Sequence, residues 1–78
     1  MTEFEGLKAF YASYIRFGLE NNVACTYAKL GNNIFHKYCE VLVENSNYQD
    51  SEKMAMKQEL EILKNALDGE IDTYFQRS

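Results

Sequence analysis

Residues 52–75 have the sequence EKMAMKQELEILKNALDGEIDTYF and carry the most regular apolar pattern of the chain. Apolar side chains recur there at spacings of three and four, which is the period of one face of an α-helix. They are Met56, Leu60, Leu63, Leu67, Ile71 and Tyr74. Another face carries opposite charges one helical turn apart, a favourable arrangement on a helix, in Lys57, Glu61, Lys64 and Asp68. This pattern predicts a helix over residues 51–76.

The first twenty residues predict a second helix. Thr2 and Glu5 have the spacing of a capping box, in which two free backbone N–H groups of the first turn are satisfied. Apolar residues then recur at helical spacing, with Phe10 and Phe17 beside the main stripe. That stripe consists of Phe4, Leu7, Tyr11 and Tyr14. We expect a helix over residues 3–20 with a wide, aromatic apolar face.

The middle of the chain carries a third helical pattern, which begins after Asn21-Asn22 interrupts the first stripe. The new stripe has its own phase and comprises Val23, Tyr27, Leu30, Ile34, Tyr38 and Val41. Its constant phase favours one helix over residues 23–44, whereas the triplet at residues 31–33, Gly-Asn-Asn, is typical of a break. A helical Gly costs about 1 kcal/mol relative to Ala, which packing can offset. We predict a continuous helix, with a kink at 31–33 as the alternative.

These segments together predict an all-α protein. The polar run at residues 45–51 is the clearest loop, and the chain has no Pro and only four Gly, too few turn residues for an all-β domain. With 78 residues, residues 1–78 form a single helical domain. The expected architecture is a small three-helix bundle or a long helical hairpin. Because so small a core supplies only about 3–5 kcal/mol, we expect a dimer.

Charge and hydropathy restrict the class of function. The formal net charge of −4 disfavours nonspecific attraction to nucleic acid and to anionic membranes. No apolar run approaches the roughly 18 residues of a membrane span, and the N-terminus lacks a basic stretch followed by an apolar one. We therefore expect a cytoplasmic protein that contacts neither nucleic acid nor membrane directly.

Residues that could carry chemistry are few. Cys25, His36 and Cys39 are the only soft metal ligands, one fewer than a structural zinc site needs. Both Cys residues are expected to be free thiols. A single His, without a Gly-x-Ser-x-Gly turn or a phosphate-binding Gly loop, does not assemble a nucleophilic site. We predict that the protein is not an enzyme and binds no metal or cofactor.

Aromatic residues carry the strongest functional signal. Six Tyr and five Phe are more than a three-helix core of this size can bury, and Tyr is enriched at protein interfaces. Either the Tyr residues simply surround the core, or the first helix presents a partner-binding face. The residues of that face would be Phe10, Tyr11, Tyr14 and Phe17. The sequence thus predicts a small protein–protein interaction module, an adaptor, co-chaperone or inhibitor, that docks this face on a protein partner or on itself.

Two alternatives rest on charge. An acidic decoy would occlude the nucleic-acid-binding surface of a host protein, with carboxylates in place of phosphates. Its acidic surface would be Glu59, Glu61, Asp68, Glu70 and Asp72. Lys57 and Lys64 interrupt this surface. A small transcriptional regulator would instead require a dimer that gathers Lys8, Lys29 and Lys37 on one face.

Residues 46–77 resemble components of bacterial type III secretion. The segment combines the pair Tyr48-Gln49 with an amphipathic helix that ends IDTYFQR at residues 71–77. It is similar in this to two helical-hairpin families, the needle subunits and their small co-chaperones. Needle subunits have a Pro in the turn between their helices, and this chain has no Pro. The short, acidic composition, rich in Tyr and Asn, also resembles that of phage-encoded inhibitors such as anti-CRISPR proteins.

Overall fold

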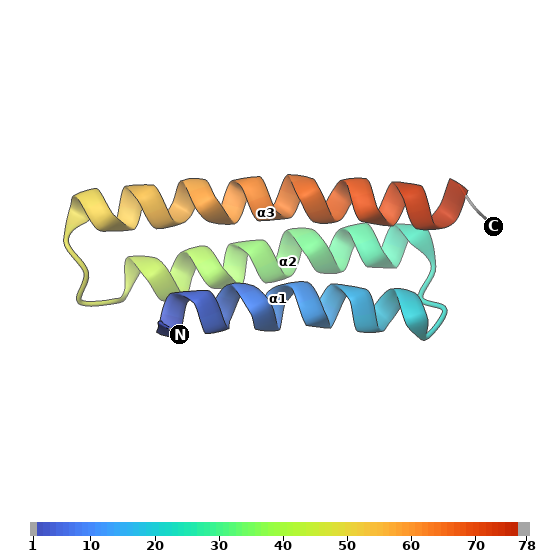
Figure 1. The fold of residues 1–78 in the computed structure, drawn as a ribbon, viewed down its shortest axis with the longest axis horizontal. Coiled ribbons are helices and arrows are strands. Elements are labelled where there is room, and N and C mark those ends of the chain that lie inside the picture. Colours follow the sequence, from blue (N-terminus) through green and yellow to red (C-terminus); the bar gives the residue numbers. More distant parts are fainter. Residues whose placement is uncertain (1, 77–78) are drawn as a thin grey trace.

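The computed structural model describes residues 2–76 and shows three helices joined by two short connections (Figure 1). Helix α1 spans Glu3–Glu20, α2 spans Cys25–Glu44 and α3 spans Asp50–Gln76. Successive helices run in opposite directions, and each packs against both of the others. The all-α prediction is confirmed, and of the two expected architectures the three-helix bundle is the one found. The bundle is elongated, with extents of 44 × 18 × 18 Å.

Helix α1 has the predicted bounds because both of its ends are capped locally. At the start, Thr2 Oγ1 accepts a hydrogen bond from the backbone N–H of Glu5 at 3.1 Å. At the end, Asn22 has a φ of 64°, the left-handed conformation that Asn tolerates better than most residues. The N–H of Val23 then bonds the carbonyl oxygen of Gly18 at 3.1 Å. This hydrogen bond closes a Schellman motif, so the Asn pair ends the helix.

Helix α2 is continuous through Gly31, as predicted, and the alternative kink at 31–33 is absent. It begins two residues later than predicted, because Val23 is part of the α1 cap and Ala24 is extended, with a ψ of 150°. A Cβ added at Gly31 would meet no atom within 4 Å. Steric contacts within the chain therefore do not require a glycine at this position.

Helix α3 begins one residue before the predicted start and supplies the most apolar side of the core. Leu60, Leu67 and Ile71 are fully buried, as their stripe predicts, whereas Tyr74 at the end of the stripe is 41% exposed. None of the helices over residues 2–76 is both long enough and apolar enough to cross a membrane.

The core lies along the axis between the three helices. Helix α1 contributes Tyr11, Ala12, Ile15 and Leu19, and α2 contributes Ala28, Cys39 and Val43. Two polar residues of α2, Asn32 and His36, are buried in the same core. Asn32 is bonded to both other helices, and the rotation of α2 that places it inward creates the candidate site.

Candidate functional site

Helix α2 turns its most apolar stripe away from the core. Tyr27, Ile34 and Tyr38 expose 68%, 61% and 56% of their surface, and Leu30 and Val41 on the same stripe are also exposed. An amphipathic helix of a small bundle normally directs such a stripe inward. The stripe correctly predicts a helix, but in this chain it lies on the surface.

Small and polar side chains form the inward face of α2 instead. Asn32 is completely buried and is bonded to both other helices. The hydroxyl of Tyr11 lies against both acceptors of Asn32, the side-chain Oδ1 and the backbone oxygen, the latter at 3.0 Å. Asn32 Nδ2 donates to the backbone oxygen of Lys64 at 3.0 Å and to Asp68 Oδ1 at 2.7 Å. Because a buried amide is tolerated only when it is hydrogen-bonded, this network holds α2 in its observed rotation.

Tyr11 is not on the surface, where the sequence analysis placed it. Its side chain is 0% exposed, its ring stacks on Phe35 with the centroids 4.9 Å apart, and burial raises the pKa of its hydroxyl above the ordinary value. Its hydroxyl belongs to the Asn32 network, which the spacing of α1 alone does not reveal. The other three predicted residues, Phe10, Tyr14 and Phe17, are exposed at 65%, 56% and 66%.

Phe35 joins the exposed residues of α1 to those of α2. Its ring centroid lies 5.9 Å from that of Phe10, 5.1 Å from that of Tyr14 and 6.1 Å from that of Tyr38, all separations at which aromatic rings attract. The two helices therefore present one connected surface, which we call the aromatic face. It consists of Phe10, Tyr14 and Phe17 of α1 with Tyr27, Ile34 and Tyr38 of α2, and is flanked by Leu30, Val41 and Leu42.

The aromatic face has no charged member, and two cations beside it, Arg16 and Lys29, turn toward α3. Arg16 precedes Phe17 in sequence, yet its guanidinium forms two hydrogen bonds to Glu70, at 2.9 and 2.8 Å. Lys29 of α2 likewise extends to Asp72, with Nζ and Oδ1 2.6 Å apart. No ion pair among residues 2–76 joins α1 to α2. The outer seam between these two helices is therefore apolar except at the start of α1, where Glu3 lies.

Two hollows lie along this seam, at its opposite ends. The first has a volume of about 280 Å³. Its lining includes Phe17 and Gly18 near the end of α1, and Tyr27 and Gly31 in the first half of α2. It is slightly smaller than the roughly 300–1,000 Å³ of typical small-molecule sites. Its size and apolar lining suit one or two side chains of a protein partner.

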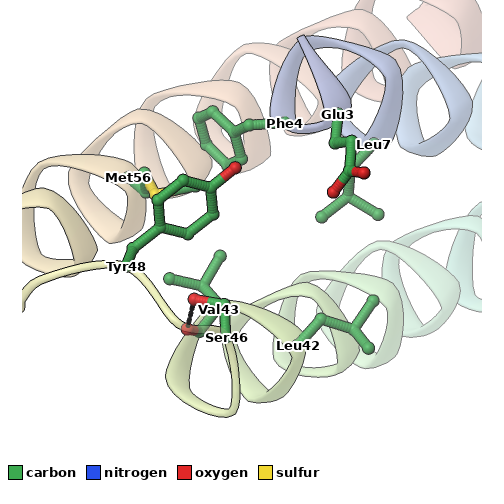
Figure 2. Close-up of a pocket in the computed structure, with 8 residues that line it drawn as sticks. All are labelled: Glu3, Phe4, Leu7, Leu42, Val43, Ser46, Tyr48 and Met56. Atoms are coloured by element: carbon green, nitrogen blue, oxygen red, sulfur yellow. Dashed lines mark hydrogen bonds between the residues drawn. The ribbon is translucent and has the colours of Figure 1, made fainter.

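The second hollow, of about 240 Å³, lies between the start of α1 and the end of α2. Figure 2 shows Leu7 of α1 and Leu42 of α2 on opposite sides of it. Tyr48, in the connection to α3, covers one end beside Phe4 and Met56. Both hollows thus lie on the seam that carries the aromatic face.

The acidic residues predicted as an anionic surface lie along the seams between α3 and the other helices. Glu59 pairs with Lys8, with Oε1 and Nζ 3.0 Å apart, and Glu70 pairs with Arg16. The hydrogen bond from Arg16 lowers the pKa of Glu70 below its ordinary value, and the same contact raises the pKa of Arg16. These two pairs join α1 to α3.

The other acids of that set face α2. Asp72 pairs with Lys29, and Asp68 accepts the hydrogen bond from Asn32. Glu61 Oε2 lies 3.3 Å from the Nε2 of His36. Four of the five carboxylates therefore connect helices to one another, whereas Glu61 lies beside His36, whose buried Nε2 makes no hydrogen bond to residues 2–76.

The three soft ligands do not gather into a site. His36 is 7% exposed, and its Nδ1 and Nε2 lie near Glu40 and Glu61, at 3.7 and 3.3 Å. Cys25 and Cys39 are free thiols, as expected, and burial raises the pKa of the Cys39 thiol to about 11. Across the described residues, no group of three or more His, Cys, Asp or Glu could hold a metal ion.

Comparison of this chain with protein-family models, curated proteins and solved structures finds no match. Neither the needle-subunit likeness nor the phage-inhibitor likeness of the sequence is therefore supported by a matching relative. The functional conclusion rests on the geometry of the aromatic face.

Sequence reasoning missed the α2 half of this face. The signal was present, because Asn32 and His36 are spaced by four and lie on the side of α2 opposite Tyr27 and Ile34. A polar pair of this kind usually marks the solvated side of a helix. Only the partners that α1 and α3 bring to Asn32 make this the inward side.

Proposed function

We propose that this protein is a non-enzymatic protein–protein interaction module, of the adaptor, co-chaperone or inhibitor type, that docks through its aromatic face. The observation that carries this proposal is the outward direction of the α2 stripe beside the exposed rings of α1. Single exposed apolar residues are ordinary on a protein surface. A connected apolar patch above a few hundred Å² is typical of an interaction site.

The size of the aromatic face exceeds that threshold. Phe and Tyr each bury about 150–250 Å² when packed. At the observed exposed fractions, the five rings alone present on the order of 600 Å². These rings are Phe10, Tyr14, Phe17, Tyr27 and Tyr38. A surface of this area supports specific docking rather than incidental contact.

The chemistry of the face indicates what it would bind. Aromatic anchors beside small hollows are typical of the residues that dominate binding energy at protein interfaces. Phe17 and Tyr27 border the hollow of about 280 Å³, so a partner side chain entering it would contact both rings. The matching surface of the partner is apolar and uncharged at its centre, because the face itself has no charged member.

The ion pairs favour this reading over the acidic decoy. A decoy needs carboxylates that are free to contact cations of its target. Glu59, Glu70 and Asp72 already contact cations of their own chain. The aromatic rings, in contrast, have one side exposed and without a partner among residues 2–76.

Site-specific photo-crosslinking in the native host cells tests the proposal. A photoreactive Phe analogue is placed at Phe17, in the face, and at Ile62 of α3, which is 68% exposed but lies outside it. We expect a crosslinked protein band from position 17 and none from position 62. Equal crosslinking from both positions, or none from position 17, would contradict the proposal.

A further inference from the structure

We infer that the occupant of the aromatic face is a second copy of this chain, related to the first by a two-fold axis. The inference rests on the proposed function and specifies the partner of the same face. In the resulting dimer, the α1–α2 pair of one copy packs on the α1–α2 pair of the other, with each α3 on the outside. Three properties of the face support a second copy.

The first property is area. A stable interface buries roughly 800 Å² on each partner. The five rings supply on the order of 600 Å² of this. The flanking aliphatic side chains supply the rest, with exposed fractions of 61% for Ile34, 51% for Leu30, 46% for Val41 and 40% for Leu42. One face therefore matches the area that each copy needs in a standard interface.

The second property is charge. A two-fold axis brings the same patch of both copies together, so any charge at its centre would lie against the same charge of the second copy and be repelled. The aromatic face has no charged member, and Arg16 and Lys29 beside it are paired with α3. Helix α3 holds seven acidic and three basic residues, a net charge of −4 that equals the formal charge of the whole chain, and it is on the outside of such a dimer. Two copies with a net charge of −4 each can thus meet without like charges at the centre of the contact.

The third property is the environment of α2. In one chain α2 buries Asn32, His36 and Cys39 while Tyr27, Ile34 and Tyr38 face water. In the dimer both sides of α2 are covered, the polar side by its own bundle and the apolar side by the second copy. Protruding rings and hollows occur on the same face, so each copy provides both the side chains and the spaces that a self-complementary contact requires.

The decisive experiment compares two matched isoleucines. Ile34 and Ile62 are exposed at 61% and 68%, and both lie inside helices, but only Ile34 belongs to the aromatic face. The molar masses of the unmodified chain, Ile34→Glu and Ile62→Glu are measured by sedimentation equilibrium over a wide range of micromolar concentrations. Far-ultraviolet circular dichroism confirms that each variant remains helical, and Tyr27→Glu serves as a second variant of the face.

We expect twice the chain mass of 9.1 kDa for the unmodified protein and for Ile62→Glu. Ile34→Glu and Tyr27→Glu should raise the dimer dissociation constant by roughly 100-fold or more, since each places a charge in the interface twice. A chain that is monomeric throughout, or a dimer that resists both face substitutions, overturns the inference.

Failure of the inference is distinguishable from failure of the proposed function. If the chain is a monomer and position 17 crosslinks to a protein of another mass, the proposed interaction module is supported and only the inference of a second copy is contradicted. If the chain is a monomer and position 17 gives no crosslink, both the proposed function and the inference are contradicted.

Discussion

The Tyr11 hydroxyl donates a hydrogen bond to the backbone oxygen of Asn32 at 3.0 Å, and both side chains are completely buried. This contact joins α1 to α2, and Asn32 extends the connection to Lys64 and Asp68 of α3. Buried polar groups often contribute little to stability, and in some proteins they instead specify one arrangement of the helices. Here the polar contacts specify which side of α2 faces inward, and so which side is left for docking.

The first prediction concerns this network. Tyr11→Phe should lower the free energy of unfolding by about 1–3 kcal/mol, because it removes the hydroxyl that contacts the buried Oδ1 of Asn32. Tyr74→Phe removes a hydroxyl from a ring that is 41% exposed and should change stability by less than about 0.5 kcal/mol. Urea denaturation at one fixed protein concentration measures both. Equal effects would mean that the Tyr11 hydrogen bond contributes nothing specific.

A double-mutant cycle tests the coupling between the two residues. Asn32→Leu alone removes the Oδ1 acceptor that the Tyr11 hydroxyl contacts and the Nδ2 donor to Asp68, and should be strongly destabilising. In combination with Tyr11→Phe, the loss should be smaller than the sum of the single losses by about 0.5–3 kcal/mol. Strict additivity of the two substitutions would argue against the network.

The second prediction concerns alkaline pH. Burial raises the pKa of Cys39 from 9.0 to about 11 and also raises that of Tyr11. The unfolded chain loses these protons at lower pH than the folded chain does. Stability should therefore be insensitive to both groups below pH 9.0 and should fall as the pH rises toward 11, by about 1.4 kcal/mol per pH unit for each titrating group, with Cys39 contributing from pH 9.0 and Tyr11 only from pH 10.0.

Chemical denaturation from neutral pH to pH 11 measures this decline. Cys39→Ala should be less stable at neutral pH because it leaves a small cavity. Its decline just above pH 9 should be shallower, because one titrating group is gone. If the stability of Cys39→Ala declines with pH as steeply as that of the unmodified chain, Cys39 does not titrate as a buried thiol.

The third prediction concerns acidic pH and the Arg16–Glu70 pair. The pKa of Glu70 is lowered by the hydrogen bond from Arg16, so the unfolded chain binds a proton first as the pH falls. The stability that this pair contributes should be present above pH 4.5, the ordinary value, and lost below it. Since both side chains are about half exposed, the contribution should be no more than about 1 kcal/mol.

Thermal denaturation of Glu70→Gln between neutral pH and pH 3 tests this contribution. The variant should be slightly less stable at neutral pH and should converge with the unmodified chain in acid. Added salt should reduce the difference at neutral pH, because it screens exposed charges. Glu20→Gln, which removes a carboxylate without an ion pair among residues 2–76, should show no such loss.

The fourth prediction uses two glycines. A Cβ at Gly31 or at Gly69 meets no atom within 4 Å of it in one chain, so replacement by Ala should favour each helix by about 0.5–1 kcal/mol. Gly31 lines the hollow beside Phe17 and Tyr27, whereas Gly69 lies on α3. If a second copy inserts a side chain there, Gly31→Ala should weaken the dimer while Gly69→Ala should not. Sedimentation equilibrium gives the dimer dissociation constant of each variant, and chemical denaturation of the same samples gives its free energy of unfolding.

The helices themselves are predictable from the sequence because they depend on local contacts. Thr2 caps α1 through a residue three positions away, and Asn22 ends it through Gly18 and Val23. The apolar stripe over residues 52–75 likewise matches the buried side of α3. The expectation of exposed rings on α1 holds for Phe10, Tyr14 and Phe17, whose positions on one helix are set by its 3.6-residue period.

What the sequence by itself determined, then, is three helices, their bounds to within two residues and an excess of aromatic surface. Only the tertiary structure decided that Tyr11 lies inside and that the apolar stripe of α2 lies outside. The physical reason is that Asn32 is costly to bury alone and is tolerated once Tyr11 and Asp68 satisfy its hydrogen bonds. Those partners are 21 and 36 residues away in the chain, so no local pattern could have indicated them.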